Sequence, residues 1–294
     1  MEFLSWGSDP WGQEVLIRIS WNLLYLAAGS GILFVIAHSM YLAWFVPQRK
    51  YGLFEQDSDS IQTANVPERV ARHSLASRLF HWVMAATMLV LLFTGFLPVI
   101  GVQFAWVTIH WVAGVVLTLS IVFHIIHSTF WMDLWTMWVS RRDITEAINR
   151  FKRSVGQAAP APRKHAKYPL ENRLYHHAIL VTGGMVICTG ILMMFRIETP
   201  LWTRDPYLFD FTSQTWGMIY VLHGLSSVSL VTLIIAHIYF GLRPEKRFLT
   251  WSMINGWIGR DHFVEHHDPN QWNPTQHPES RPINAPSTQA PESR

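Results

Sequence analysis

The sequence predicts an all-α integral membrane protein with five transmembrane helices. Half of the 294 residues are hydrophobic and only 15% are charged, whereas soluble domains carry about 25% charged residues. The apolar residues gather in five blocks, each long enough to cross about 30 Å of hydrocarbon as a helix. Only a helix satisfies its own backbone hydrogen bonds over such a length in lipid. The blocks cover residues 16–46, 79–100, 104–130, 175–195 and 216–242.

The basic residues predict the orientation of these helices. Five spans place the two termini on opposite sides of the membrane. One side holds residues 47–78, 131–174 and 243–294, and it carries all but three of the 23 Lys and Arg residues. By the positive-inside rule this side is cytoplasmic and the N-terminus is periplasmic, as in a bacterial inner membrane.

Composition also excludes several classes of function. The net charge is +3, but the basic residues lie in the connections between apolar blocks, so we expect no nucleic-acid partner. The single cysteine, Cys188, excludes intramolecular disulfides, cysteine-ligated iron–sulfur clusters and a covalently attached haem. We predict no tandem repeat.

Histidines inside the apolar blocks form two layers. In the fifth block His223 and His237 are 14 residues apart, which places them within about 40° of one helix face and about 21 Å apart along the axis. His110 and His124 have the same spacing in the third block, and His81 lies at the start of the second. Helix direction groups His110 with His223 near the periplasm. Near the cytoplasm it groups His237 with either His81 or His124.

Opposed histidines from different helices indicate haem. Two neutral imidazoles are a common axial ligand set for haem iron, and ionisable groups inside a membrane usually mark function. A single such histidine is more often a packing or proton-relay residue, as we expect for His38, but two layers favour haem. Gly95 and Gly114 lie on the ligand faces, where they leave room for haem or allow close helix packing. A surface metal site at His266 and His267 is disfavoured because the sequence offers no further ligand nearby.

Three segments carry a resemblance to a known family. The first is Arg-Leu-Phe-His-Trp at 78–82, and its helix ends with Thr-Gly-Phe at 94–96. The second is His-Trp-Val-Ala-Gly at 110–114, and the third runs from Leu-His to His-Ile-Tyr over 222–239. Over residues 72–267 the sequence resembles the cytochrome b (gamma) subunit of respiratory formate dehydrogenases. The start of the first segment is shared with the di-haem b subunits of nickel–iron hydrogenases and thiosulfate reductases.

The resemblance implies a four-helix bundle with two b haems stacked across the membrane. His81 and His237 would bind the cytoplasmic haem, and His110 and His223 the periplasmic one. His124 would then be a neighbour of the haem or the quinone. The equal 14-residue spacings still leave open a bc1-like arrangement, in which His124 is the ligand.

The resemblance also implies a quinone site beside the cytoplasmic haem, where the fourth helix begins. The matching residues here are Tyr168, Glu171, Asn172 and Arg173. Pro169 and Glu171 depart from the family pattern, and proline offers neither an amide side chain nor a backbone N–H.

The implied function is electron transfer from a periplasmic dehydrogenase, formate dehydrogenase in the first instance, through its iron–sulfur subunit and two b haems to the quinone pool. The chain has no substrate-oxidising site of its own.

We expect a periplasmic N-terminus with one extra helix over 1–46, a cytoplasmic connection over 47–78, and the cytochrome domain over 79–267. A short surface helix is expected near 143–151. Residues 268–294 contain six prolines and are expected to be a disordered tail.

Other functions remain open at this point. A hydrogenase or thiosulfate reductase complex would use a subunit of the same design. A histidine-lined transporter or channel would need polar or broken helices near the midplane. A purely structural anchor would need no layered histidines.

Overall fold

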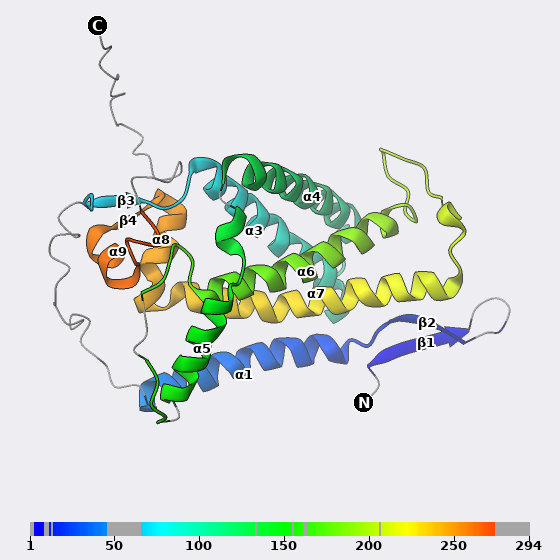
Figure 1. Cartoon of the computed structure of the whole chain (residues 1–294). Helices are drawn as coiled ribbons and strands as arrows, with labels where there is room; N and C mark the ends of the chain where they lie inside the picture. The colour runs from blue at the N-terminus through cyan, green and yellow to red at the C-terminus, as the bar shows by residue number, and fades with distance from the viewer. Residues whose placement is uncertain are drawn as a thin grey trace, which may run out of the picture. The chain divides into compact units, whose positions relative to one another are not determined.

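The computed structural model describes residues 3–8, 12, 14–45, 66–132, 134–154, 156–160, 164–205 and 207–273 (Figure 1). Predictions for residues 46–65 of the connection and 274–294 of the tail lie outside the described residues. The chain divides into two compact units. The first holds residues 1–49, 82–123 and 174–243, and the second holds residues 50–81, 124–173 and 244–294.

Five helices in the described part of the chain are long and apolar enough to cross a membrane, which confirms the predicted fold class. Their outer faces are apolar as well: the exposed fractions of Leu33, Leu119 and Val181 are 66%, 64% and 68%. Such surfaces require lipid rather than water around them. The helices are α1 (Asn22–Phe45), α3 (Leu75–Phe96), α4 (Trp106–Trp131), α6 (Leu170–Met194) and α7 (Ser213–Leu242).

The first unit is built around a bundle of α3, α4, α6 and α7. Met88 of α3, Leu117 of α4 and Leu230 of α7 form its buried centre. Ile179 and Val186 of α6 pack against this centre. The four helices therefore share one core, which holds their inner faces at fixed positions.

A β-hairpin precedes the first helix and was not predicted. It pairs β1 (Leu4–Ser8) with β2 (Glu14–Ile19). The predicted helical block began at Leu16, but the chain is extended there and α1 begins only at Asn22. The physical reason is the short-range pattern of β2, in which Leu16 and Ile19 are buried on α7 while Ile17 and Arg18 are exposed.

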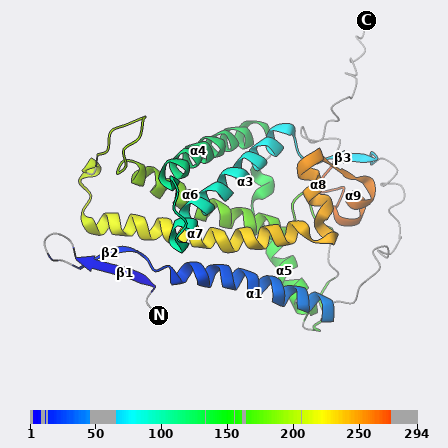
Figure 2. The same cartoon turned by 180° about the vertical axis from the view of Figure 1, so that it is seen from behind.

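The extra N-terminal helix packs along α7, as both views show (Figure 1, Figure 2). Gly31 of α1 allows this approach, because a Cβ there would lie 3.1 Å from the side chain of Ile235. Thr232 of α7 donates a hydrogen bond of 2.9 Å to the carbonyl of Ala27. His38 shares a hydrogen bond of 2.9 Å with the hydroxyl of Tyr239. The packing role expected for His38 agrees with this contact.

The second unit has its own small core. Strand β3 (Arg69–Ala71) pairs with β4 (Trp257–Gly259), and α8 (Arg247–Asn255) and α9 (Arg260–His266) complete the fold. The amphipathic helix α5 (Arg141–Ser154) covers the segment predicted as a surface helix. The remaining short elements are 3₁₀ turns at Leu97–Ile100, Leu134–Met137, Leu208–Asp210 and Pro244–Lys246.

The boundary predicted for the polar tail is corrected at its start. Residues 268–273 belong to the core of the second unit, because Trp272 is only 1% exposed and its ring meets Phe263 at 4.9 Å. The backbone N–H of Trp272 donates to the carbonyl of Asp268 at 2.9 Å. A buried tryptophan ring removes a large apolar area from water, and this burial holds the end of the described chain in the second unit.

Candidate functional site

His110 of α4 and His223 of α7 face one another within the first unit. Their ring centroids are 6.4 Å apart and the ring planes make an angle of 64°. Two imidazoles bind one metal ion at about 2.0 Å, each through a nitrogen about 1.1 Å from its ring centre, so their centroids lie about 6.2 Å apart. The observed separation therefore fits a pair of axial ligands to a single iron.

A threonine on the neighbouring helix orients His110. Thr94 of α3 places its Oγ1 2.8 Å from the Nδ1 of His110. The same hydroxyl donates to the carbonyl of Val90 at 2.7 Å. A hydroxyl has one proton and a carbonyl only accepts, so the Nδ1–H of His110 donates to Thr94. The Nε2 of this tautomer has a lone pair available for a metal.

The second pair repeats this arrangement. Thr189 of α6 places its Oγ1 3.0 Å from the Nδ1 of His223 and donates to the carbonyl of Met185 at 2.6 Å. Both opposed imidazoles therefore present Nε2 as the basic nitrogen. Neutral imidazoles in this tautomer are the form that binds haem iron.

Glycines allow the threonine-bearing helices to lie close to these rings. A Cβ at Gly95 would lie 3.6 Å from Cε1 of His110, and one at Gly190 would lie 3.4 Å from Cε1 of His223. Gly114 is less constrained, because a Cβ there would be 4.0 Å from its nearest neighbour, Leu91. The described contacts thus place Gly95 against a predicted ligand, whereas Gly114 meets a leucine.

An apolar cavity of about 210 Å³ lies between α4 and α6 in the same unit. Val115 and Leu119 line it from α4, Ile191 and Met194 from α6, and Trp202 from the segment that follows. The indole Nε1–H of Trp202 is satisfied by the carbonyl of Met194 at 3.0 Å. Opposed imidazoles within an apolar helix bundle suit a flat, largely apolar macrocycle, so the residues present fit haem.

Thr189 and Gly190 were not predicted as site residues, and Thr94 was noted only as part of the Thr-Gly-Phe motif. An internal similarity in the sequence points to all three. Arg-Leu-aromatic-His at 78–81 recurs at 173–176, and Thr-Gly at 94–95 recurs at 189–190, both at an offset of 95 residues. The histidines of α4 and α7 are related by a single offset of 113 residues. This dispersed pattern is not a tandem repeat, because the two offsets differ.

Two of the other predicted histidines stack on aromatic rings. His237 of α7 stacks on Tyr175 with centroids 4.9 Å apart, and His124 of α4 stacks on Phe80 at 4.1 Å. These two stacks correspond under the internal similarity. His81 belongs to the second unit and His237 to the first, so their pairing remains a prediction from the sequence.

The residues predicted to contact quinone have several different partners. Arg173 is buried and ion-paired with Asp143 at 2.7 Å, and it also donates to the carbonyl of Trp138. Burial raises the pKa of Asp143, but hydrogen bonds from Ser140 and the positive charge of Arg173 outweigh burial, so the pKa lies below its ordinary value. Arg173 thus ties α5 to the start of α6.

Two of the predicted quinone residues share a cavity in the second unit. Tyr168 and Arg173 line a mainly polar cavity of about 230 Å³. Glu171 forms an exposed ion pair with Lys246 at 3.4 Å. The backbone N–H of Asn172 donates to the carbonyl of Pro169 at 3.1 Å, in the first turn of α6.

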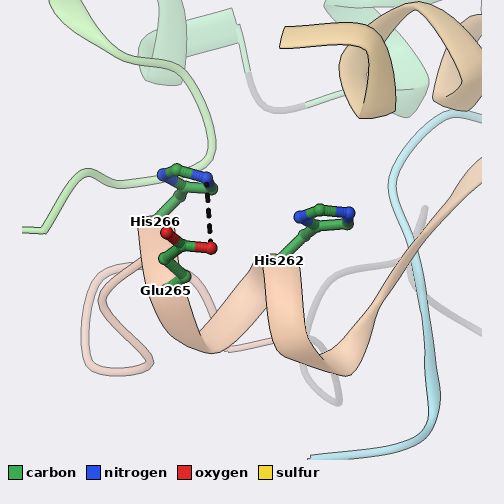
Figure 3. Close-up of side chains that lie close together, drawn as sticks. All are labelled: His262, Glu265 and His266. Carbon is green, nitrogen blue, oxygen red and sulfur yellow. Dashed lines mark ion pairs between the residues drawn. The ribbon is translucent and has the colours of Figure 1, made fainter. Parts of the chain in front are cut away.

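A cluster of possible metal ligands lies on α9, shown in Figure 3. His262, Glu265 and His266 bring one ligand atom each within 4.8 Å of one another. However, both histidine rings stack on Phe248, at centroid distances of 4.5 and 5.1 Å. His267 does not join them, since its Nδ1 faces the carbonyl of Ala166 at 2.9 Å. Ring packing explains both histidines, and we assign no site here.

A buried arginine holds His267. Arg72 is 2% exposed, and its Nη1 lies 3.2 Å from Nε2 of His267 while Nη2 donates to the carbonyl of Lys167 at 3.0 Å. Burial and then the charge of Arg72 lower the pKa of His267 to about 3. Burial also lowers the pKa of Arg72 itself, to about 10. This group is a structural centre of the second unit.

Comparison with protein-family models gives a match over the four-helix region. The model of the prokaryotic cytochrome b561 family matches residues 72–256, more than half of the chain. No curated protein matches the sequence. The matched range contains both Thr–His pairs and all four histidines predicted as haem ligands.

Proposed function

Because the chain belongs to the prokaryotic cytochrome b561 family, we propose that it is the di-haem cytochrome b subunit that anchors a respiratory complex and delivers its electrons to quinone. Membership of the family establishes the coarser part of this statement. The protein is a multi-pass membrane cytochrome that binds b-type haem through histidines and transfers electrons. The number of haems, the partners and the quinone are the proposal.

The opposed rings of His110 and His223 are the observation that carries the proposal. Haem supplies one-electron exchange between ferric and ferrous iron. The chain contributes two neutral imidazoles, held at fixed positions by the bundle core and by the threonine hydrogen bonds. Each ligand comes from a different helix, so the pair also joins α4 to α7.

A second haem is assigned to His81 and His237. The support is the resemblance together with the position of His237, which is 14 residues from His223 on α7 and therefore about 21 Å along the axis. His124 is the alternative partner in this layer. Two haems stacked in this way would span most of the hydrocarbon thickness, which is about 30 Å.

Electrons are proposed to enter on the periplasmic side and leave on the cytoplasmic side. The distribution of basic residues supports this orientation. The donor is an iron–sulfur subunit of a periplasmic dehydrogenase, formate dehydrogenase by resemblance. A hydrogenase or thiosulfate reductase complex is the alternative donor, with the same internal path.

Quinone is proposed to bind where α6 begins. Tyr168 and Arg173 share a cavity there, and Glu171 and Asn172 occupy the first turn of the helix. Tyr168, Asn172 and Arg173 can donate hydrogen bonds to a quinone carbonyl, and the Glu171 carboxylate can carry protons from the cytoplasm. Tyr168, Glu171, Asn172 and Arg173 are the residues proposed to contact the quinone, and ion pairs with Asp143 and Lys246 hold Arg173 and Glu171.

A histidine-lined transporter is the rival class. It would need charged or broken helices near the midplane. The five predicted spans contain no Asp, Glu or Lys. Their one Arg is Arg18, near the start of the first span, and Arg196 lies just beyond the end of the fourth. The histidines of one layer face each other in a way that suits iron, and cytochrome function is the better reading.

A haem count tests the proposal. Purified chain should give a reduced-minus-oxidised spectrum of b-type cytochrome and about two non-covalent haems per chain by pyridine haemochrome assay. Replacing His110 or His223 by Ala should remove one haem and leave the other. One haem or none in the unsubstituted protein would contradict the di-haem assignment.

A further inference from the structure

We propose that Thr94 and Thr189 lower the reduction potential of the haem held by His110 and His223, by accepting a hydrogen bond from the Nδ1–H of each ligand. The inference rests on the proposed function, because it concerns the haem assigned to this pair of histidines. Both threonines act through a ligand, so they are positioning residues.

The direction of each hydrogen bond follows from the backbone. The hydroxyl of Thr94 lies 2.7 Å from the carbonyl of Val90, and that of Thr189 lies 2.6 Å from the carbonyl of Met185. Each hydroxyl donates its single hydrogen to that carbonyl. The remaining contact, 2.8 Å for His110 and 3.0 Å for His223, must therefore be donated by the imidazole.

A ligand that donates in this way is a stronger base towards iron. An acceptor at Nδ1–H shifts electron density to Nε2, which favours the more positive ferric state. The haem potential falls as a result, since axial ligation and hydrogen bonds around it set this quantity. The same bonds fix the planes of the rings, which lie at 64° to each other.

The second layer has a different environment around its histidines. His237 stacks on Tyr175, and His124 stacks on Phe80. Tyr175 belongs to α6, the helix that carries Thr189, and Phe80 belongs to α3, the helix that carries Thr94. Thr94 and Thr189 contact His110 and His223, so the proposed effect concerns the haem of this pair. A lower potential at this haem favours passing its electron on to the next acceptor.

The experiment is a redox titration of the haem-loaded full chain in detergent. Thr94→Val and Thr189→Val keep the side-chain size and remove the hydroxyl acceptor, while the carbonyl of Val186 stays hydrogen-bonded to His223. Each should raise the reduced-to-oxidised ratio of one haem at a fixed potential by about three- to tenfold, where tenfold equals about 59 mV for one electron. The double variant should show a larger shift, and the ferric EPR signal of that haem should change because it depends on the angle between the ligand planes.

Matched controls separate this effect from a general loss of packing. Thr87→Val and Thr182→Val remove the same kind of bond to a carbonyl, 2.9 and 2.7 Å long, on the same two helices. They should leave both potentials unchanged. Thr94→Ser and Thr189→Ser retain the acceptor and should also remain close to the unsubstituted protein.

Three outcomes would overturn the inference. They are unchanged potentials in the Val variants, equal shifts in the Val and Ser variants, or equal shifts in the control threonines. If a Val variant loses its haem, Thr94→Cys and Thr189→Cys keep the volume with a weaker acceptor; an unchanged potential there is equally decisive. Failure of the proposed function looks different: His110→Ala and His223→Ala would leave the haem content unchanged.

Discussion

The imidazole of His124 lies face to face on the ring of Phe80, with centroids 4.1 Å apart and planes within 6°. The corresponding pair under the internal similarity is His237 on Tyr175, 4.9 Å apart and within 16°. Equivalent packing of His124 and His237 means that stacking alone does not distinguish a ligand from a packing histidine. The choice between His81 and His124 in this layer needs substitution.

We predict that His81→Ala removes the second haem and that His124→Ala leaves both. The reason is the resemblance of residues 78–82 to the family pattern, in which the histidine before tryptophan is the ligand. Haem content and the number of redox transitions per chain measure the result. Phe80→Leu is a useful control, because it removes the ring stacked on His124 and keeps His81.

The reverse outcome would establish the bc1-like pairing. In that case His124→Ala would lose one haem while His81→Ala kept two. The same measurement therefore decides between the two arrangements.

A small residue at position 190 is predicted to be required for the haem of His110 and His223. A Cβ added at this position would lie 3.4 Å from Cε1 of His223, so the side chain of alanine would displace the imidazole very little. Leucine adds three further carbons in that direction and must displace the imidazole, because packed interiors have little spare volume. Gly190→Ala should retain both haems and Gly190→Leu should lose one, by pyridine haemochrome assay.

Gly184 provides the matched control on the same helix. No atom lies within 4 Å of a Cβ built at this position. Gly184→Leu should therefore retain two haems. Retention of both haems in Gly190→Leu as well would show that this glycine does not set the ligand position.

The five spans were predictable because their signal is local. Twenty or more apolar residues in a row have few alternatives to a transmembrane helix. The hairpin was not predictable from the same signal, since Leu16, Ile17 and Ile19 of β2 adjoin the apolar block with Arg18 the one charged residue among them. The burial of Leu16 and Ile19 on α7 is a tertiary contact between residues more than 200 positions apart.

The residues of the candidate site likewise differ in whether a local pattern in the sequence indicates them. The histidines were identified by their helical spacing, but Thr94 and Thr189 were not. A threonine in a membrane helix commonly bonds its own preceding turn, and nothing local indicates a second partner on another helix. The burial of Trp272 was not predicted for a similar reason, because the polar, proline-rich composition of the tail does not indicate its contact with Phe263.

Quinone reduction is predicted to depend on the first turn of α6. Substituting both Glu171→Gln and Asn172→Ala should slow electron transfer to quinone by about tenfold or more, since each lost hydrogen bond costs about 1–3 kcal/mol. Haem reduction by the partner should be unaffected. The two rates are measured separately, by quinol formation and by the absorbance of reduced haem.

Lys246→Gln is the control for this double variant. It breaks the exposed ion pair with Glu171, which contributes at most about 1 kcal/mol, and it leaves the carboxylate in place. Quinone turnover should remain normal in Lys246→Gln. Full turnover and full inhibitor sensitivity in the double variant would refute this placement of the site.

The second unit is predicted to lose stability as the pH falls from about 6.5 towards 3, and His267 is one cause. Burial, followed by the charge of Arg72, lowers its pKa in the folded protein to about 3, while an unfolded histidine titrates near about 6.5. Between these values the unfolded chain binds a proton that the folded chain does not. The free energy of unfolding therefore decreases by up to about 1.4 kcal/mol per pH unit.

His267→Gln keeps a donor for the carbonyl of Ala166 and an acceptor for Arg72 but cannot titrate. Its thermal stability in detergent should fall less steeply over this pH range than that of the unsubstituted protein, even if it is lower at pH 7. His73, whose pKa is also lowered by burial, is present in both proteins, so the difference between the two curves isolates His267. Parallel curves would mean that His267 is not a source of the acid sensitivity.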